Sequence, residues 1–171
     1  GTIAVTLNSY TCRFTSTGSC VPTLGLTFIW TPAAASSAPT NDLVCSATPI
    51  SCGGSLNGTT INATNSGTGE NLTCGTTQSQ PGVWYVIAGT GQQMTASLCA
   101  TVWDSKISIF SGPNCSTLTC VGGVDDNGPS CASSSASYSF STSVGTNYYI
   151  LVHGYSSSSN FTLSLTCTTP P

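Results

Sequence analysis

The stretch Phe161-Thr162-Leu163-Ser164-Leu165-Thr166-Cys167 decides the fold class. Its apolar side chains recur at every second position, and hydroxylated residues lie between them. A period of two is typical of a β-strand that has one face in a core and the other in solvent. We therefore predict a strand over residues 161–167.

Similar short runs precede this strand at intervals of about ten residues, and Gly, Asn and Ser separate them. No window rich in helix formers shows the period of an α-helix. This spacing predicts an all-β, disulfide-rich protein with a jelly-roll-like β-sandwich. The other expected strands are residues 82–88, 94–99, 107–110, 136–140 and 148–153.

Residues 1–31 form a separate segment in which two stretches also alternate. Residues 3–7 predict one strand and residues 24–30 a second, more apolar one, so the sandwich is expected to carry an extra N-terminal pair of strands. Residues 32–40, rich in Pro, Ala and Ser, predict an extended linker. The sandwich is expected over residues 41–167, and residues 168–171 form a Thr/Pro tail. The candidate assembly strand presents Leu24, Leu26, Phe28 and Trp30 on one face.

The composition excludes several classes of function. Of 171 residues, 4% are charged, 39% are hydrophobic, and the net charge is −3. Two basic residues cannot neutralise a phosphate backbone, so we predict no nucleic-acid partner. No apolar run reaches the length of a transmembrane helix, so we predict no membrane span. One His leaves few groups that titrate near neutrality, and we predict that the protein is not an enzyme.

Ten cysteines in a chain rich in Ser, Thr and Gly predict five disulfides and an oxidising, extracellular location. A chain that opens at Gly1 without a signal peptide is expected to be a processed, secreted form. Cys12–Cys20 and Cys115–Cys120 are the expected local bridges, followed by Cys99–Cys131. The predicted disulfide residues are Cys12, Cys20, Cys45, Cys52, Cys74, Cys99, Cys115, Cys120, Cys131 and Cys167.

Five Asn-x-Ser/Thr sequons predict N-linked glycans. A surface with so few charges has little electrostatic repulsion to keep molecules apart, and glycans would supply hydration and bulk. The Thr/Pro tail is a further candidate for O-linked glycans. The sequon residues are Asn57, Asn62, Asn71, Asn114 and Asn160.

The few acidic residues could serve as oxygen ligands of a structural Ca²⁺, although no EF-hand spacing is present. Alternatively, Asp and Asn cap turns through hydrogen bonds from their side chains to the backbone. No cofactor is required under either interpretation. The metal candidates are Asn41, Asp42, Asp104, Asp125 and Asp126.

Two further features allow a functional and a structural interpretation. His153 ends an apolar run, where a structural role is expected over a Ser-His-Asp triad, because the sequence lacks a G-x-S-x-G elbow. Trp103, Tyr138 and Tyr155 adjoin predicted loops and could form a platform on which sugar rings stack. Trp84 and Tyr85 lie within an apolar strand and are expected in the core.

Six short stretches, which begin with Asn41-Asp42-Leu43-Val44-Cys45-Ser46-Ala47 and end with Tyr148-Tyr149-Ile150-Leu151-Val152-His153-Gly154, occur in an order that resembles a known module. This module is the Cys-rich variant of the bacterial pre-peptidase C-terminal domain superfamily, found in secreted bacterial, diatom and other algal proteins. The resemblance covers about residues 41–167 and implies a β-sandwich jelly roll that is usually appended to other domains. Some relatives bind Ca²⁺ at the opening acidic segment, which here corresponds to Asn41 and Asp42. The matching stretches are residues 41–47, 82–85, 89–91, 103–106, 123–126 and 148–154.

These observations favour a secreted, glycosylated structural subunit of an extracellular fibril or cell-surface assembly. We expect a head-to-tail homopolymer in which the strand at residues 23–31 enters the sandwich of the next molecule by β-augmentation. The same strand could also fold back on its own domain. The alternative functions are a carbohydrate-binding module and a Ca²⁺-dependent accessory domain of a secreted hydrolase.

Overall fold

A computed structural model describes residues 37–64 and 73–169. Within these ranges the protein is an all-β sandwich of two main sheets, and its helical content is the 3-10 turn η1 (Val44–Ser46). No helix in the described ranges could span a membrane. The expected N-terminal strands, the bridge Cys12–Cys20 and the sequon at Asn71 lie outside the described residues.

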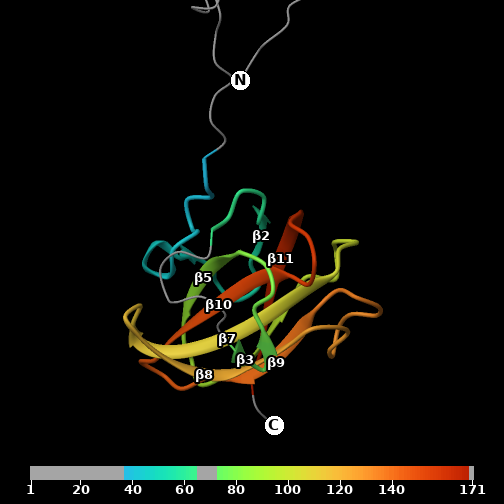
Figure 1. The fold of residues 1–171 in the computed structure, drawn as a ribbon. Coiled ribbons are helices and arrows are strands. Elements are labelled where there is room, and N and C mark those ends of the chain that lie inside the picture. The colour runs from blue at the N-terminus through green and yellow to red at the C-terminus, as the bar shows by residue number, and fades with distance from the viewer. Residues whose placement is uncertain (1–36, 65–72, 170–171) are drawn as a thin grey trace, which may run out of the picture. The chain divides into compact units, whose positions relative to one another are not determined.

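The five-stranded sheet has the order β1-β5-β10-β7-β8 and the four-stranded sheet the order β2-β11-β6-β9 (Figure 1). From β5 onward the chain crosses repeatedly between the two sheets, as in a jelly roll. The small sheet β3-β4 completes the fold. The strands are β1 (Thr48–Pro49), β2 (Ser55–Thr59), β3 (Thr73–Cys74), β4 (Thr76–Thr77), β5 (Gly82–Ala88), β6 (Gln93–Ser97), β7 (Ser105–Asn114), β8 (Thr117–Val124), β9 (Ser137–Ser141), β10 (Asn147–Gly154) and β11 (Asn160–Thr168).

The alternation that predicted residues 161–167 is confirmed in β11. Phe161, Leu163 and Leu165 are buried, whereas the residues between them are not. The expected strand at residues 82–88 has the same bounds as β5. β11 extends to Thr168, which pairs with Gln93, so the predicted tail begins later than expected.

Five strands, β1, β2, β3, β4 and β8, were missed, and the two longest of them, β2 and β8, carry little apolar pattern in their sequences. β2 has a single large apolar residue, Leu56, and β8 is mostly exposed, with Gly122 and Gly123 near its end. Both lie at a sheet edge. An edge strand can be recruited by main-chain pairing alone, which leaves no periodic signal in its side chains.

Two apolar clusters hold the sandwich together. The larger one fills the space between the sheets and includes Val83, Ile109, Ile150 and Leu163. The smaller one lies on the other face of the five-stranded sheet, because alternate residues of β5, β7 and β10 point to opposite faces. Its members are Val44, Cys74, Trp84, Phe110, Tyr149 and Leu151.

Four disulfides link the described cysteines, and they indicate folding in an oxidising environment. Cys99–Cys131 is confirmed. The predicted bridge Cys115–Cys120 is wrong: Cys115 pairs with Cys45, and Cys120 with Cys74. Only four residues lie between the two cysteines in sequence, but Cys115 lies in the turn between β7 and β8 and Cys120 lies within β8, opposite Phe110. The fourth bridge is Cys52–Cys167.

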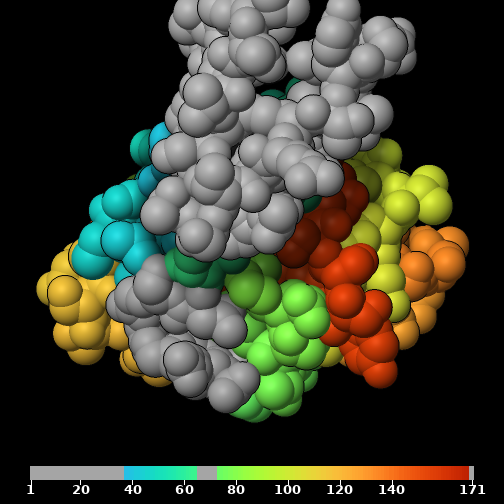
Figure 2. Space-filling model, turned by 45° about the horizontal axis from the view of Figure 1, so that its top comes forward, coloured from blue at the N-terminus to red at the C-terminus, as the bar shows by residue number. Residues whose placement is uncertain are grey.

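The bridge Cys45–Cys115 fixes η1 to the turn between β7 and β8. In the space-filling view the cyan segment that contains η1 lies near the gold turn (Figure 2). Cys74–Cys120 similarly ties β3 to β8. Both bridges therefore fasten covering segments to the outer face of the five-stranded sheet.

Candidate functional site

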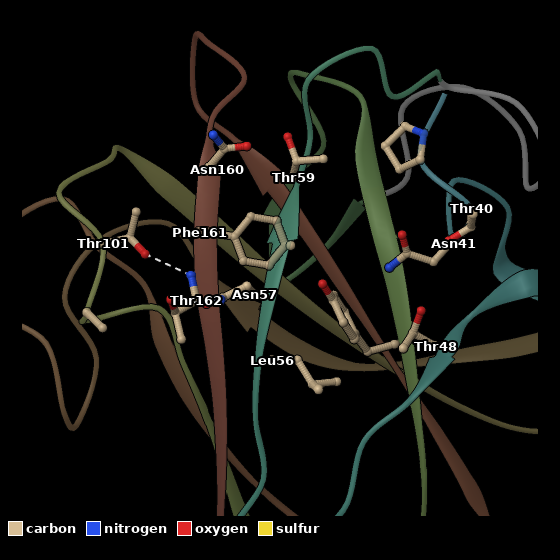
Figure 3. Close-up of a pocket in the computed structure, with 14 residues that line it drawn as sticks. Thr40, Asn41, Thr48, Leu56, Asn57, Thr59, Thr101, Asn160, Phe161 and Thr162 are labelled. Atoms are coloured by element: carbon tan, nitrogen blue, oxygen red, sulfur yellow. Dashed lines mark hydrogen bonds between the residues drawn. The ribbon is translucent and has the colours of Figure 1, made fainter. Parts of the chain in front are cut away.

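A groove of about 800 Å³ lies where the edges of the two sheets meet (Figure 3). β1 is the first strand of one sheet and β2 the first strand of the other, and both contribute to the lining. The remaining lining comes from the turn at residues 39–41, from β5, from residues 100–101 and from β11. The groove therefore gives access to the space between the sheets.

The floor of the groove is aromatic. The rings of Tyr85 and Phe161 meet edge to face with their centroids 6.2 Å apart, and the Trp103 ring, which does not line the groove, stacks on Phe161 with a centroid distance of 6.1 Å. Gly58 faces these rings from β2, and a Cβ at this position would lie 2.2 Å from the Tyr85 hydroxyl and 2.5 Å from the Phe161 ring. A larger residue here would displace the floor, so the glycine makes this close approach possible.

Polar groups at the rim are engaged with the backbone. The Asn41 side-chain amide donates to the Trp84 carbonyl at 3.0 Å, and the Trp84 N–H donates to the Asn41 carbonyl at 2.8 Å. On the opposite rim the Thr162 N–H donates to the Thr101 hydroxyl at 3.0 Å (Figure 3). Burial raises the pKa of Tyr85, and its hydrogen bond with Asn41 opposes that shift. The rim is thus uncharged and pre-organised.

Main-chain groups border the groove as well as side chains. Among the described strands, β2 pairs with β11 alone and β1 with β5 alone, so each has an edge without a strand partner. β1 has only two residues, Thr48 and Pro49, and Pro49 has no backbone N–H to donate to a neighbouring strand. Such an edge can accept another strand. The arrangement combines an apolar floor with hydrogen-bonding edges.

The structure divides the predicted metal ligands into two places. Asp104, Asp125 and Asp126 come together, with one carboxylate oxygen of each within 4.8 Å of the others. Asn41 and Asp42 lie at the groove end instead, where Asp42 accepts hydrogen bonds from the Thr64 N–H and hydroxyl. Both side chains therefore make contacts between segments far apart in sequence, Asn41 with β5 and Asp42 with Thr64, and not local turn caps.

Lys106, on β7, partly neutralises the negative charge of the acidic cluster formed by Asp104, Asp125 and Asp126. Its ammonium lies 3.0 Å from an Asp125 oxygen, and 4.8 Å from the centroid of the Tyr155 ring. Burial raises the pKa of Asp104, with smaller contributions from the Asp126 and Asp125 carboxylates, and Lys106 opposes the shift. Nothing in the sequence signalled that Lys106 is buried, since its neighbours fit an ordinary strand.

His153 occupies a structural position. Its ring is fully buried, and its Nε2 lies 3.5 Å from the hydroxyl of Ser108, which is 1% exposed. Burial, together with the nearby Lys106 charge, lowers the pKa of His153 to about 3. A Ser–His pair thus exists, but both members are inaccessible to a substrate. This geometry supports the structural interpretation of His153.

The aromatic platform is wrong for Trp103, because that ring is 7% exposed and stacked on Phe161. Tyr138 is half-buried against the core between the sheets, and its hydroxyl closely approaches Gly122. Tyr155 is 53% exposed, yet its ring already contacts the Lys106 ammonium. The three rings lie in different environments and do not form one surface. Trp84 and Tyr85 are buried as expected.

The described sequons lie at the surface. Asn57, Asn62, Asn114 and Asn160 are exposed. The Asn114 carbonyl oxygen accepts from the Ser116 N–H at 2.9 Å, and the Asn57 carbonyl oxygen accepts from the Thr162 hydroxyl at 2.9 Å. Both bonds use the amide oxygen, so neither involves the nitrogen to which a glycan would be attached.

Comparison with known proteins found no matching family model, no matching curated protein and no matching solved structure. The resemblance to the pre-peptidase C-terminal superfamily therefore stays a prediction. The groove was not predicted, although two of its floor residues, Tyr85 and Phe161, had been assigned to apolar strands. What the sequence could not indicate is that β1 and β2 leave an opening between the sheets.

Proposed function

We propose that the protein is a secreted, glycosylated structural subunit of an extracellular fibril or cell-surface assembly. Residues 23–31 of one molecule enter the groove between β1 and β2 of the next, so the polymer grows head to tail. The observation that carries this proposal is the groove itself, which joins an aromatic floor to two strand edges. A head-to-tail contact of this kind need not close, so it yields a filament.

The chemistry of the groove suits an alternating strand. Leu24, Leu26, Phe28 and Trp30 would face Leu56, Tyr85 and Phe161, and the rim carries no ionised side chain. Each fully buried apolar side chain contributes about 1.5–3 kcal/mol. Main-chain pairing with an edge would fix the register, as in other cases of β-augmentation.

The remaining features support a structural subunit over an enzyme. Four disulfides stabilise the described domain, and the buried Ser108–His153 pair is closed to substrates. The low charge and the sequons suit a glycoprotein of an extracellular matrix or surface. Among the described residues that line the groove, the buried Tyr85 is the one titratable side chain that could act in proton transfer.

Paired substitutions in the full chain test the donor strand. Phe28→Asp places a charge on its apolar face, whereas Thr27→Asp places the same charge on the opposite face. We expect Phe28→Asp to abolish filaments in negative-stain images and Thr27→Asp to retain them. Filaments of normal length from Phe28→Asp would contradict the proposal.

A mixing experiment separates exchange between molecules from a strand that folds back on its own domain. Leu56→Arg should block the groove but leave a working donor, and Phe28→Asp has the reverse defect. If the strand exchanges, mixing the two variants yields a one-to-one dimer, since one intact donor meets one intact groove. If the strand folds back, both variants stay monomeric after mixing, as judged by light scattering.

A structural Ca²⁺ remains a second proposal, now centred on Asp104, Asp125 and Asp126. One oxygen each of Asp104 and Asp125 is buried without a hydrogen-bond partner, and oxygen-rich sites of this kind suit Ca²⁺. Binding would raise the melting temperature by mass action. We expect Ca²⁺ to raise it in the native protein and not in Asp126→Asn. An equal melting temperature with Ca²⁺ and with a chelator would exclude the ion.

A further inference from the structure

Lys106 is the one basic residue of the described ranges, and it is buried. The other basic residue of the chain, Arg13, lies outside those ranges. Lys106 is 5% exposed, and its Nζ lies 3.0 Å from Asp125 Oδ2 and 3.4 Å from the Thr77 carbonyl oxygen. The Tyr155 ring contacts the same ammonium. Burial of an ammonium carries a desolvation penalty that a single ion pair need not offset.

Lys106 and Asp125 face each other at the open end of the β7–β8 hairpin. In this antiparallel pair Ile107 lies opposite Val124, so one step outward places Lys106 opposite Asp125. Opposite residues of such a pair have Cβ atoms about 4.5–5.5 Å apart, and their side chains share one face of the sheet. The backbone therefore holds the two side chains in contact, in addition to the attraction between their charges.

The carboxylates beside Lys106 have buried oxygen atoms without partners. Asp125 Oδ1 and Asp104 Oδ1 are both buried, and neither accepts a hydrogen bond from a described residue. One carboxylate oxygen of Asp104 lies within 4.8 Å of one of Asp125. An unsatisfied buried carboxylate oxygen is more costly than the less charged oxygen of an amide. A second carboxyl group at this distance can also carry protons to and from the first.

We propose that Lys106 Nζ and Asp125 Cγ form an intramolecular amide bond, with Asp104 as the proton carrier. Nζ is already 3.0 Å from Oδ2, and Cγ is one bond beyond that oxygen. Reacting atoms held about 3–3.5 Å apart are in a near-attack geometry, which replaces a high concentration of a free amine. The proposal depends neither on strand exchange nor on glycosylation.

The reaction balances without an oxidant, a reductant or a cofactor. Asp104 first transfers one proton from the Lys106 ammonium to Asp125 Oδ2, and the neutral amine attacks Cγ. The new N–C bond forms while the electron pair of the C=O double bond moves onto Oδ1. Asp104 then transfers a second proton from the nitrogen to Oδ2. The C=O bond to Oδ1 forms again, the Cγ–Oδ2 bond breaks, and Oδ2 leaves as water.

The surroundings favour the amide over the ion pair. The amide is neutral, so its formation removes a buried ammonium and its partner charge. The Asp125 side chain is 37% exposed, which gives the released water a path to solvent. Among the described strands β8 pairs with β7 alone. The amide would fasten the open end of this hairpin, whereas the Cys74–Cys120 bridge fastens β8 to β3.

Peptide mass spectrometry of the full chain tests the bond. A Ca²⁺ held by Asp125 would occupy the carboxylate, so the protein is first incubated with a chelator. After denaturation and reduction, chymotrypsin cleaves after Phe110 and Leu118 and separates Lys106 from Asp125 along the chain. We expect the two peptides to stay joined, with a mass equal to their sum less one water molecule. Two separate peptides would overturn the proposal.

Substitutions at the two ends of the bond identify its atoms. Lys106→Arg keeps a cation beside Asp125, but a guanidinium stays protonated and does not attack a carboxyl carbon. We expect separate peptides from this variant, and joined peptides would overturn the assignment to Lys106. Asp125→Asn should give joined peptides of the same mass as the native protein, because ammonia leaves in place of water. Separate peptides from folded Asp125→Asn would overturn the proposed reaction.

Two matched substitutions test the role of Asp104. Asp104→Asn removes the proton carrier, and we expect the fraction of joined peptides after equal incubation to fall at least about tenfold. Asp126→Asn makes the same change at the neighbouring carboxylate and should leave that fraction unchanged. Far-UV circular dichroism checks that both variants are folded. Equal fractions in the two variants would overturn the role of Asp104. Because Asp126→Asn also removes a candidate Ca²⁺ ligand, it separates this proposal from the ion.

Discussion

The outer faces of the two sheets have opposite characters. On the five-stranded sheet, Trp84, Phe110, Tyr149 and Leu151 lie beneath η1 and the β3–β4 hairpin, and two disulfides fasten this cover. On the four-stranded sheet, the corresponding face presents hydroxyl and amide groups to the surface. The covered face therefore contributes to stability through buried apolar side chains, whereas the hydroxyl face, the outer face of β2, β6, β9 and β11 in the four-stranded sheet, presents polar side chains.

The largest effect should come from a cavity in the covered face. Phe110 is 5% exposed and its ring centroid lies 5.6 Å from that of Trp84. We expect Phe110→Ala to lower the free energy of unfolding by about 3–5 kcal/mol. Thr166→Ala, on the hydroxyl face, should change it by less than about 0.5 kcal/mol. Denaturant unfolding with the disulfides intact measures both, and similar losses would remove the distinction between the faces.

The next effect compares two disulfides. Replacing Cys74 and Cys120 by Ser should cost about 2–5 kcal/mol, as should replacing Cys52 and Cys167. Loop entropy alone favours the second bridge, which spans 115 residues against 46. Because Cys74 is buried in the covered face, we expect loss of the Cys74–Cys120 bridge to lower the free energy of unfolding by at least as much as loss of the Cys52–Cys167 bridge. Denaturant unfolding measures both losses. A clearly smaller loss for the Cys74/Cys120 variant would show that loop length, and not burial of the bridge, decides the contribution of each disulfide.

Acid should weaken the covered face through His153. Its pKa is lowered to about 3 in the fold, so between pH 6.5 and 3 the unfolded chain binds a proton that the native protein excludes. Stability therefore falls as the pH drops through this window, on the order of 3 kcal/mol by pH 4. Asp104 acts in the opposite sense, because its raised pKa lets the native state bind a proton first.

The free energy of unfolding of His153→Gln, measured from pH 7 to pH 4, separates the contribution of His153 from that of Asp104. The substitution removes the titrating ring but keeps a neutral polar side chain, so the dependence of stability on pH should become shallower. If the native protein and this variant lose stability in parallel, His153 is not the group responsible.

A small effect is expected from a hydrogen bond on the hydroxyl face of the four-stranded sheet. The Thr95 and Ser139 hydroxyls share a bond of 2.6 Å on a half-exposed surface. Thr95→Ala should lower the free energy of unfolding by about 0.5–1 kcal/mol, since water can replace the lost partner. Calorimetry at constant pH should detect it as a small shift of melting temperature. A loss comparable to Phe110→Ala would mean that this face also stabilises the fold.

The predictability of each strand follows its burial. β5, β10 and β11 were predicted closely because their apolar residues must face a core. β11 is buried on one face and leaves a signal with a period of two, whereas β5 and β10 are buried on both faces and leave a continuous apolar run. β2 and β8 lie at edges and were missed. The groove depends on β2, so the candidate site was the part of the molecule least accessible to prediction.

The acidic residues show the same limit at the level of single side chains. Asp104, Asp125 and Asp126 were candidates because of their residue type, yet nothing in the spacing indicated that these three would meet. The β7–β8 pairing, which includes Ile107 with Val124, brings the two ends of the hairpin together. The same pairing separates Cys115 from Cys120 and directs them to Cys45 and Cys74.

The sequence alone determined the all-β class, the positions of β5, β10 and β11, the oxidising environment and the near absence of charge. These properties are local or compositional, because alternation, cysteine content and charge need no knowledge of what lies across the sheet. Tertiary structure alone decided the disulfide pairs, the groove, and which outer face is covered. It also placed the sequons of Asn57 and Asn160 opposite each other. Register and sheet order join residues about 100 apart in the chain, and such contacts leave no trace in any local pattern.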